Sequence, residues 1–322
     1  MTAMPGDSPQ VRLECAATAD GFATVLEGAL ELLADAGRIG LAGADEPADI
    51  LHTVGDVPPL RYPRTARRVH TVDRVALGRR GLTAATGWAR RQRRLTGDVV
   101  TWLVHGRTAG QVLVASGVVP GDRVHALPVM APPRSAAGGG MHRSAARERL
   151  GIAPGVGLIV GCAPNRGQAV PGWPDAIRGT GRTDVAVITC PAGRPGEAGR
   201  QGEFSLADLL AAADLFVAAG LGLTACNPAA AAVAAGVRVI AAATDSAAEL
   251  VRFGRTGLVV PPSPSAIAAA VTAGLDGVLP RTDGRAVPPG GESPARVLAR
   301  GLLGAYRRAV VSPRPRLARS VR

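Results

Sequence analysis

The sequence predicts an α/β protein made of two doubly wound, Rossmann-like domains. Short apolar segments typical of strands alternate with helix-like segments along most of the chain. The alternation is interrupted once, by the Pro-, Gly- and Ser-rich segment at residues 131–140, and then restarts. Such alternation is typical of a mostly parallel sheet covered by helices. A length of 322 residues is enough for two hydrophobic cores.

The first half of the chain supplies one set of expected elements. Strands are expected at residues 11–17, 38–43, 49–54, 68–72, 99–104 and 123–128. Helices are expected at residues 22–36, 82–95 and 107–116. The first helix is amphipathic and is followed by Gly37, a residue type that commonly ends helices. Few residues separate the strands in the middle of this half, so covering helices are expected to be missing there.

The second half repeats the pattern. Strands are expected at residues 158–161, 184–190, 215–219, 237–242 and 258–260. Ser205 is expected to cap a helix that ends near Ala213. Asn227 and Ser293 are each followed by Pro, which is the usual order of an N-cap and the first helical residue. They predict two further helix starts, the second leading to the last helix of the chain.

The charge of the chain is weak evidence for a partner. A formal net charge of +12 normally points to nucleic acid or another anionic surface. Here every basic side chain is Arg, and Ala, Gly and Pro are also abundant, which indicates a compositional bias. Aromatic residues make up only 3%, which argues against stacking platforms for nucleic acid. No specific nucleic-acid binding is therefore expected.

Metal sites and membrane spans are not expected either. None of the four cysteines forms a C-x-x-C pair, and no His lies at ligand spacing beside them. No stretch of about 18 residues is free of charges and helix breakers, and the first ten residues lack the pattern of a signal peptide. A cytoplasmic protein is the expectation. The Arg cluster at residues 90–94 reads as a solvated helix face, with peripheral contact to an anionic membrane as the alternative.

Residues 213–262 carry the most informative pattern of the chain. An Ala-Asp-hydrophobic strand, a glycine loop, a helix ending in Ala-x-Gly, an apolar strand and a Gly-Leu-Val-Val-Pro-Pro segment follow in order. This order and spacing resemble the donor half of the retaining, family-4 nucleotide-sugar glycosyltransferases. The matching residues are Ala213-Asp214, Ala235-Gly236, Val239-Ile240-Ala241, Glu249-Leu250-Val251, Thr256-Gly257-Leu258 and Pro261-Pro262.

The resemblance implies the GT-B fold, in which two doubly wound Rossmann-like domains face a cleft. It extends to residues 147–154 and 99–128 and weakens before residue 49. The implied domains are an N-terminal, acceptor-side domain at 1–133, a linker at 134–146, a C-terminal, donor-side domain at 147–290, a C-terminal helix at 291–311 and a basic tail at 312–322.

The resemblance also implies a site for a nucleotide-diphosphate sugar, the co-substrate, with no other cofactor. The helix start at Asn227 would offer free N–H groups and a positive dipole end to the diphosphate. Arg166 would replace a Lys that clamps the same group in the family. The implied donor- and phosphate-binding residues are Gly161, Arg166, Gly222, Thr224, Asn227 and Pro228.

The sequence departs from the family pattern at the donor site. The family has one Glu in the glycine loop and a second Glu eight positions later, and these positions here are Leu223 and Ala231. The family's Gly-Arg pair is Gly161-Cys162, so the Arg is missing. The helix that follows in the family is shortened here into a Pro- and Gly-rich stretch at residues 170–182.

Two residues are implied for catalysis on the acceptor side. The family often has His-Asp at the end of its middle strand. Asp73 falls at that position, or His70 serves after a small register shift. A single His on a buried strand is also commonly a structural residue, so both roles of His70 stay open.

The sequence supports two functions of different classes. The first is transfer of a sugar from a nucleotide-sugar donor to an unknown acceptor, which is a small molecule, a lipid or a glycan. The second is a non-catalytic homologue that binds a nucleotide sugar or serves as a scaffold for a protein partner. The missing carboxylates favour the second, and the extent of the resemblance favours the first.

Overall fold

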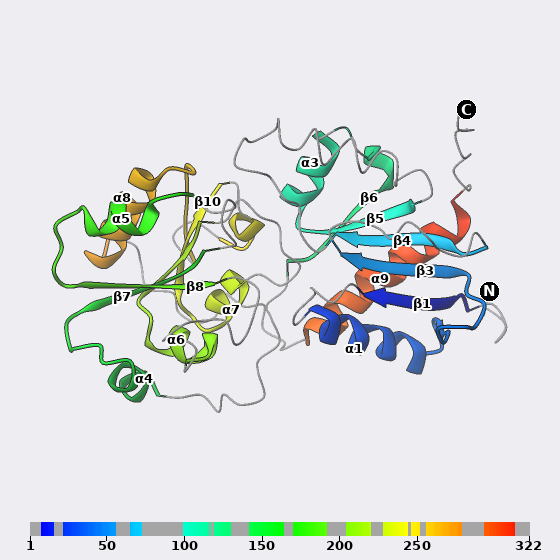
Figure 1. The fold of residues 1–322 in the computed structure, drawn as a ribbon, viewed down its shortest axis with the longest axis horizontal. Helices are drawn as coiled ribbons and strands as arrows, with labels where there is room; N and C mark the ends of the chain where they lie inside the picture. Colours follow the sequence, from blue (N-terminus) through cyan, green and yellow to red (C-terminus); the bar gives the residue numbers. More distant parts are fainter. Residues whose placement is uncertain are drawn as a thin grey trace. The chain divides into compact units, whose positions relative to one another are not determined.

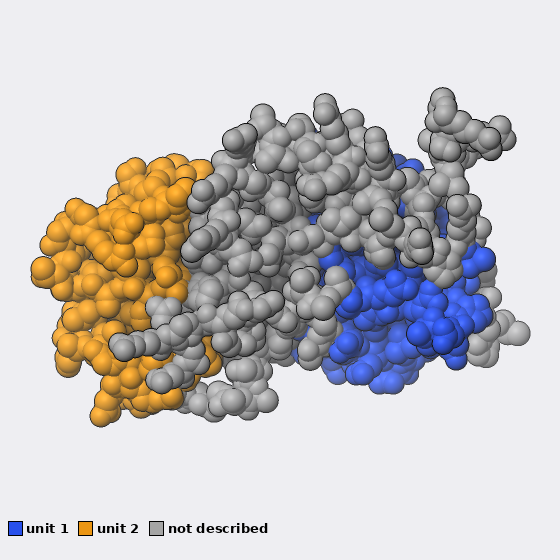
Figure 2. All heavy atoms as spheres, in the orientation of Figure 1, with its two compact units in different colours: residues 1–128, 292–322 blue, residues 129–291 orange. Residues whose placement is uncertain are grey.

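The computed structural model contains two compact units. Unit 1 contains residues 1–128 and 292–322, and unit 2 contains residues 129–291 (Figure 1). Figure 2 colours the atoms of each unit. The structure describes residues 8–15, 22–55, 65–72, 99–115, 117, 119–129, 142–163, 170–191, 204–219, 228–243, 246–251, 256–278 and 293–312.

Unit 1 contains a six-stranded parallel sheet with the order β2-β1-β3-β4-β5-β6. The strands are β1 (Gln10–Cys15), β2 (Gly40–Leu41), β3 (Ile50–Gly55), β4 (Arg67–Val72), β5 (Val99–His105) and β6 (Val124–Leu127). The helices are α1 (Phe22–Asp35), α3 (Arg107–Ala115), the 3-10 turn η1 (Gly121–Arg123) and α9 (Pro294–Val311). All six expected strands are present; the helix expected at residues 82–95 lies outside the described residues.

The last helix of the chain, α9, belongs to unit 1. Ser293 caps its start, with Oγ accepting from the N–H of Arg296 at 3.3 Å, and Pro294 is the first helical residue. One side of α9 is apolar and fully buried, with Leu298, Leu302, Ala305, Tyr306 and Ala309. Burial of this side against the sheet of unit 1 explains why a segment so distant in sequence joins this unit.

Unit 2 contains a five-stranded parallel sheet with the order β11-β10-β9-β7-β8. The strands are β7 (Gly157–Ala163), β8 (Val185–Pro191), β9 (Leu215–Ala218), β10 (Arg238–Ala242) and β11 (Gly257–Val260). The helices are α4 (Arg143–Arg149), α5 (Trp173–Arg178), α6 (Leu206–Ala212), α7 (Pro228–Ala234), the 3-10 turn η3 (Ser246–Glu249) and α8 (Pro264–Leu275).

Successive residues of the central strands of unit 2 enter two different cores. Leu158 and Val160 of β7 pack with α4, α6 and α7, whereas Ile159 between them packs with α5 and α8. Figure 1 shows α5 and α8 on one side of the sheet and α4 and α6 on the other. Strands with both faces buried are apolar throughout, which is the sequence pattern from which they were predicted. The predicted α/β fold with two doubly wound units is confirmed.

Some helices of unit 2 were not predicted. The helix α4 begins at Arg143, inside the stretch expected to be a linker. The helix α8 begins after the N-cap Ser263 and was missed because its run of Ala has little contrast between its faces. No helix of the described residues is long and apolar enough to cross a membrane.

Candidate functional site

The edge of the unit 2 sheet where β7 and β9 end is the strongest candidate for a ligand site. The first strand of the unit, β7, lies inside the sheet between β8 and β9. The chain leaves β7 toward α5 on one face and leaves β9 toward α7 on the other. From this edge, the two connections therefore run to opposite faces of the sheet. Parallel sheets bind ligands outside the carboxyl ends of their strands at such a switch point.

A backbone hydrogen bond fixes the two connections at this edge. The N–H of Val170 donates to the carbonyl oxygen of Ala219 at 2.7 Å. Val170 comes just before α5, and Ala219 comes just after β9. Both residues are almost completely buried. The end of one connection is thus held beside the start of the other, which gives the candidate site a defined border.

Gly161 lies in β7 at this end of the sheet, opposite Val217 of β9. A Cβ atom at Gly161 would lie 2.5 Å from Cη2 and Cζ2 of Trp173 and 3.2 Å from the carbonyl oxygen of Val217. The Trp173 side chain is fully buried in the core beside α5. The missing side chain at position 161 therefore lets the indole lie against the strand. This packing role is a reason for a Gly here that is separate from any contact with a ligand.

The other residues that the sequence implied for donor binding are mostly not described. Pro228 is the first residue of α7, which packs against β9 and β10. Arg166, Gly222, Thr224 and Asn227 lie outside the described residues, so their roles stay predictions. Ala231, at a family Glu position, is part-buried and packs against the core of α4, α6 and α7. A methyl group therefore occupies the position where the family has a carboxylate.

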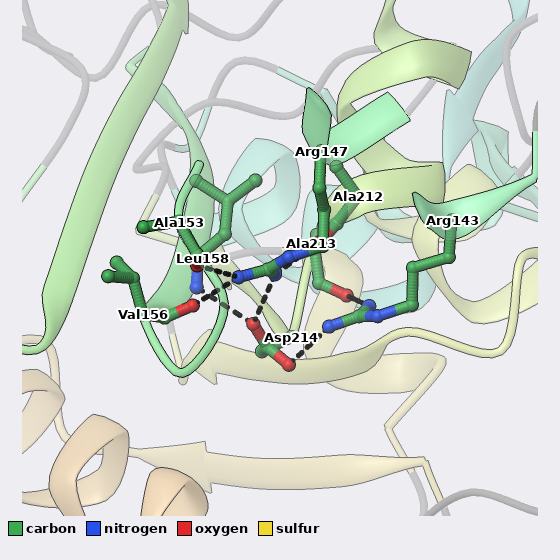
Figure 3. Close-up of polar contacts among 8 residues, drawn as sticks. All are labelled: Arg143, Arg147, Ala153, Val156, Leu158, Ala212, Ala213 and Asp214. Carbon is green, nitrogen blue, oxygen red and sulfur yellow. Dashed lines mark hydrogen bonds and ion pairs between the residues drawn. The ribbon is translucent and has the colours of Figure 1, made fainter. Parts of the chain in front are cut away.

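A second polar cluster surrounds Asp214 at the opposite, amino edge of the same sheet (Figure 3). The carboxylate accepts from the N–H of Leu158 at 2.8 Å and from Arg147 Nη1 at 3.2 Å through Oδ2. Its Oδ1 accepts from Arg143 Nη2 at 2.6 Å. One carboxylate thus joins the start of β9 to the start of β7 and to the helix α4.

Arg147 extends this cluster to the backbone. Its guanidinium donates to the carbonyl oxygens of Ala212, at 3.1 Å, Ala153, at 3.3 Å, and Val156. Only 14% of the Arg147 side chain is exposed, and its bonds to Ala212 and Val156 are partly shielded from water. The cluster holds α4 on the sheet at the edge away from the β7–β9 switch point. Asp214, part of the family-like pattern, is therefore a structural residue.

We expect Asp214→Asn to lower the free energy of unfolding of unit 2 by about 2 kcal/mol. The amide would keep the shape of the carboxylate but would leave Arg147 without a charged partner in a shielded position. Urea unfolding followed by circular dichroism measures the change. The matched control is Asp175→Asn, which removes an exposed ion pair with Arg178 and should cost less than about 0.5 kcal/mol. Equal effects of the two substitutions would contradict the structural role of Asp214.

His70 lies in β4 of unit 1 and is fully buried. Its Nδ1 is hydrogen-bonded to Thr53 Oγ1 at 2.8 Å, and its ring lies edge-on to Trp102 with centroids 5.1 Å apart. Among the described residues its Nε2 has no hydrogen-bond partner. Burial, followed by the nearby Arg68 charge, lowers the pKa of His70 to about 3. These surroundings favour the structural role of His70; its catalytic role stays a prediction, and Asp73 lies outside the described residues.

Two further buried histidines of unit 1 were not singled out from the sequence. His52 is hydrogen-bonded through Nδ1 to Tyr306 Oη at 2.6 Å and through Nε2 to Thr71 Oγ1 at 2.7 Å. His105, the last residue of β5, is hydrogen-bonded through Nδ1 to the carbonyl oxygen of Pro128 at 3.3 Å. Burial lowers the pKa of His52 to about 3 and that of His105 to about 4. In the described part of the chain, no group of His, Cys, Asp and Glu has an arrangement that could hold a metal ion.

Comparison with known proteins gives the following similarities. The model of the family "Glycosyl transferases group 1" matches residues 197–276. No curated protein matches the sequence. A glycosyltransferase from Rickettsia africae is similar in structure, with a TM-score of 0.53, 11% identity and coverage of 94% of each chain. Anabaena HepE in complex with UDP-glucose has a TM-score of 0.53 and 12% identity, over 94% of this chain and 96% of that one.

A third similar structure, the E. coli trehalose-6-phosphate protein bound with UDP-2-fluoro glucose, has a TM-score of 0.59 and 11% identity. It covers 96% of this chain and all of that one. At these identities the structural likeness concerns the fold. The matched segment, residues 197–276, runs from just before α6 to the end of α8 and includes both connections that follow β9 and β10. The chain therefore has the GT-B fold of glycosyltransferases, and residues 197–276 of its second unit match the group 1 glycosyl transferases.

Proposed function

We propose that this chain binds a nucleotide-diphosphate sugar at the edge of unit 2 where β7 and β9 end, and transfers the sugar to an acceptor. One observation carries the proposal. The segment that matches the group 1 glycosyl transferases contains β9, α7 and the connection between them, which border the switch point of the sheet. The position expected from topology and the segment expected from similarity coincide. The UDP and UDP-glucose complexes of HepE support a nucleotide-sugar ligand.

The implied chemistry requires positive charge and N–H donors near the diphosphate. Negative charge on the diphosphate grows as the bond to the sugar breaks, and fixed donors stabilise that charge in the transition state. Arg166 is proposed to supply a cation. Pro228 has no N–H, so a backbone donor at the start of α7 would come from Ala230. Asn227 would cap this helix and present it to the phosphate.

A second function, donor binding without transfer, is favoured by the side chains at the two family Glu positions. Position 223 is Leu, and Ala231 packs into an apolar core. Loss of one polar contact to the transition state commonly costs about 2–4 kcal/mol of barrier, so the loss of two would slow transfer strongly. In this case the chain would act as a nucleotide-sugar-binding scaffold for a protein partner. Contact with a membrane through residues 90–94 remains a separate prediction.

A thermal-shift titration with UDP-, GDP- and ADP-sugars tests the binding proposal. A ligand that binds only the folded chain stabilises it by about 2.7 kcal/mol at 100 times its Kd. We expect one nucleotide class to raise the Tm selectively. Arg166→Ala and Asn227→Ala should abolish the shift, and the control Arg178→Ala, an exposed position far along α5, should preserve it.

Release of free nucleotide diphosphate from the bound donor then separates the two functions. Release that depends on Arg166 and Asn227 supports transfer. A selective Tm shift without release supports the non-catalytic function. No Tm shift with any donor at millimolar concentration would contradict both.

A further inference from the structure

Two of the four cysteines, Cys162 and Cys190, lie opposite each other on neighbouring strands of the unit 2 sheet. They are far apart in the sequence, so no C-x-x-C spacing connects them. Strands β7 and β8 pair in parallel along all seven residues of each strand (Figure 1). In this register Cys162 of β7 is the partner of Cys190 of β8. The sheet thus brings together two cysteines that the sequence separates.

Positions 162 and 190 also share one face of the sheet. Val160 of β7 and Ile188 of β8 both pack with the core of α4, α6 and α7. Strand residues two apart lie on the same face, so Cys162 and Cys190 belong to the face that carries these helices. Ala218 of β9, which is paired with Cys162 on the other side of β7, packs into the same core, as this alternation requires.

The register gives the two cysteines a spacing that a disulfide can bridge. Neighbouring strands lie about 4.8 Å apart, and residues in register are separated by about this distance. The Cα atoms of a disulfide are usually about 4.4–6.8 Å apart. The Cβ atoms of a relaxed disulfide are only about 3.8 Å apart, which is less than the strand spacing. A bond here would therefore draw β7 and β8 together, and such strain makes a disulfide easier to reduce.

Cys190 lies on the more accessible of the two strands. Among the described strands of unit 2, β8 is at the edge of the sheet, and its residues 185–189 are half-buried. Strand β7 lies inside the sheet, between β8 and β9. A small molecule from solvent therefore reaches Cys190 first. Cys162 directly follows Gly161, so the pair lies at the carboxyl edge of the sheet, beside the candidate site.

We propose that Cys162 and Cys190 form a reversible disulfide and are a redox-modification site of unit 2. The oxidant is a small disulfide such as oxidised glutathione. The Cys190 thiolate attacks one sulfur of the oxidant, which releases one thiolate and leaves a mixed disulfide on Cys190. The Cys162 thiolate then attacks the Cys190 sulfur and releases the second thiolate. The two cysteines lose two protons and two electrons, and the oxidant gains them as two thiols.

The modification is independent of the proposed glycosyl transfer, so it is tested without any donor. The variant C15S/C226S keeps only the two paired cysteines. This full-length chain is equilibrated with oxidised glutathione under native conditions, quenched with N-ethylmaleimide and analysed by mass spectrometry. We expect the loss of two hydrogen atoms, with no bound glutathione and no free thiol. Reduced dithiothreitol should restore both thiols, and peptide mapping without reduction should join the peptides that contain Cys162 and Cys190.

Removal of one cysteine at a time tests the order of attack. Addition of C162S to the C15S/C226S chain should trap Cys190 as a mixed disulfide with glutathione, because no second thiol displaces it. Addition of C190S should leave Cys162 largely as a free thiol over the same time, because β7 is inside the sheet. Faster modification of Cys162 than of Cys190 would contradict this order.

Circular dichroism verifies that each variant is folded. A folded C15S/C226S chain that keeps both thiols free would overturn the proposal. So would glutathione bound to both cysteines, a disulfide that forms only between two chains, or one that forms only in urea.

Discussion

The Gly257→Ala variant should unfold unit 2 at much lower urea concentration than the original chain. Gly257 begins β11, lies opposite Val239 of β10 and has a φ of +153°. A Cβ atom there would lie 1.7 Å from the carbonyl oxygen of Val239 and 2.6 Å from its carbonyl carbon. No rotamer relieves this clash, because Cβ is fixed to the backbone. We expect a loss of about 4 kcal/mol in the free energy of unfolding.

The loss of stability should arise from the contact between the backbones of Gly257 and Val239. The N–H of Val239 donates to the carbonyl oxygen of Thr256 at 2.8 Å, so any shift of Gly257 also disturbs the first bond between β10 and β11. The control is Gly304→Ala in α9, where a Cβ atom meets nothing closer than 3.9 Å and where Ala is the better helix former by up to about 1 kcal/mol. A Gly257→Ala variant as stable as the original chain would contradict the observed geometry of β11.

Unit 1 should lose much of its stability in mildly acidic solution. His52 and His70 have pKa values lowered to about 3, and that of His105 is lowered to about 4, because all three are buried. In the unfolded chain their pKa would be near the ordinary 6.5. Protons therefore bind these histidines more tightly in the unfolded chain than in the folded chain. The stability that these residues contribute is fully present above pH 6.5 and is lost as the pH falls toward 3.

Urea unfolding at about pH 7.5 and about pH 5.5 measures this loss. Between these two pH values, each of the three histidines should lower the free energy of unfolding by about 1.4 kcal/mol. The total loss should be on the order of 4 kcal/mol. His70→Gln should reduce the pH dependence by about a third. The control His142→Gln, at an exposed position, should leave it unchanged. Equal stability at the two pH values would show that these side chains do not stay neutral in the folded chain.

The strands could be predicted from the sequence because each is a short apolar run with a clear boundary. The residues of β3, β4 and β5 are almost all buried, and their predicted limits are within two residues of the observed ones. The first helix was predicted to within one residue because its apolar side repeats with the helical period. Local patterns were therefore sufficient for the two sheets.

The parts that were not predicted depend on contacts between distant segments. The packing of α9 on unit 1 depends on Tyr306 meeting His52, a contact that spans 254 positions in the sequence. The position of α4 depends on Arg147 and Asp214, which are 67 positions apart. No local pattern encodes such pairs. For the same reason the burial of His70 between Thr53 and Trp102 became evident only once β3, β4 and β5 were aligned.

The sequence predicts only the outline of the proposed donor site. It indicates the second half of the chain, and the strand order of unit 2 gives the switch point between β7 and β9. Gly161 lies at that end of the sheet, but its contact with Trp173 could not be read from the sequence because the two residues are on different elements. The same holds for the bond that joins Val170 to Ala219.

Hydrogen exchange of the full chain, with and without the nucleotide sugar that gives the largest Tm shift, tests the central claim most directly. A ligand at the switch point should slow exchange in the peptides that contain the ends of β7 and β9 and the start of α7. Peptides from the amino edge around Asp214 should be unaffected. Protection confined to the amino edge or to unit 1, or no protection anywhere, would contradict a nucleotide-sugar site between β7 and β9.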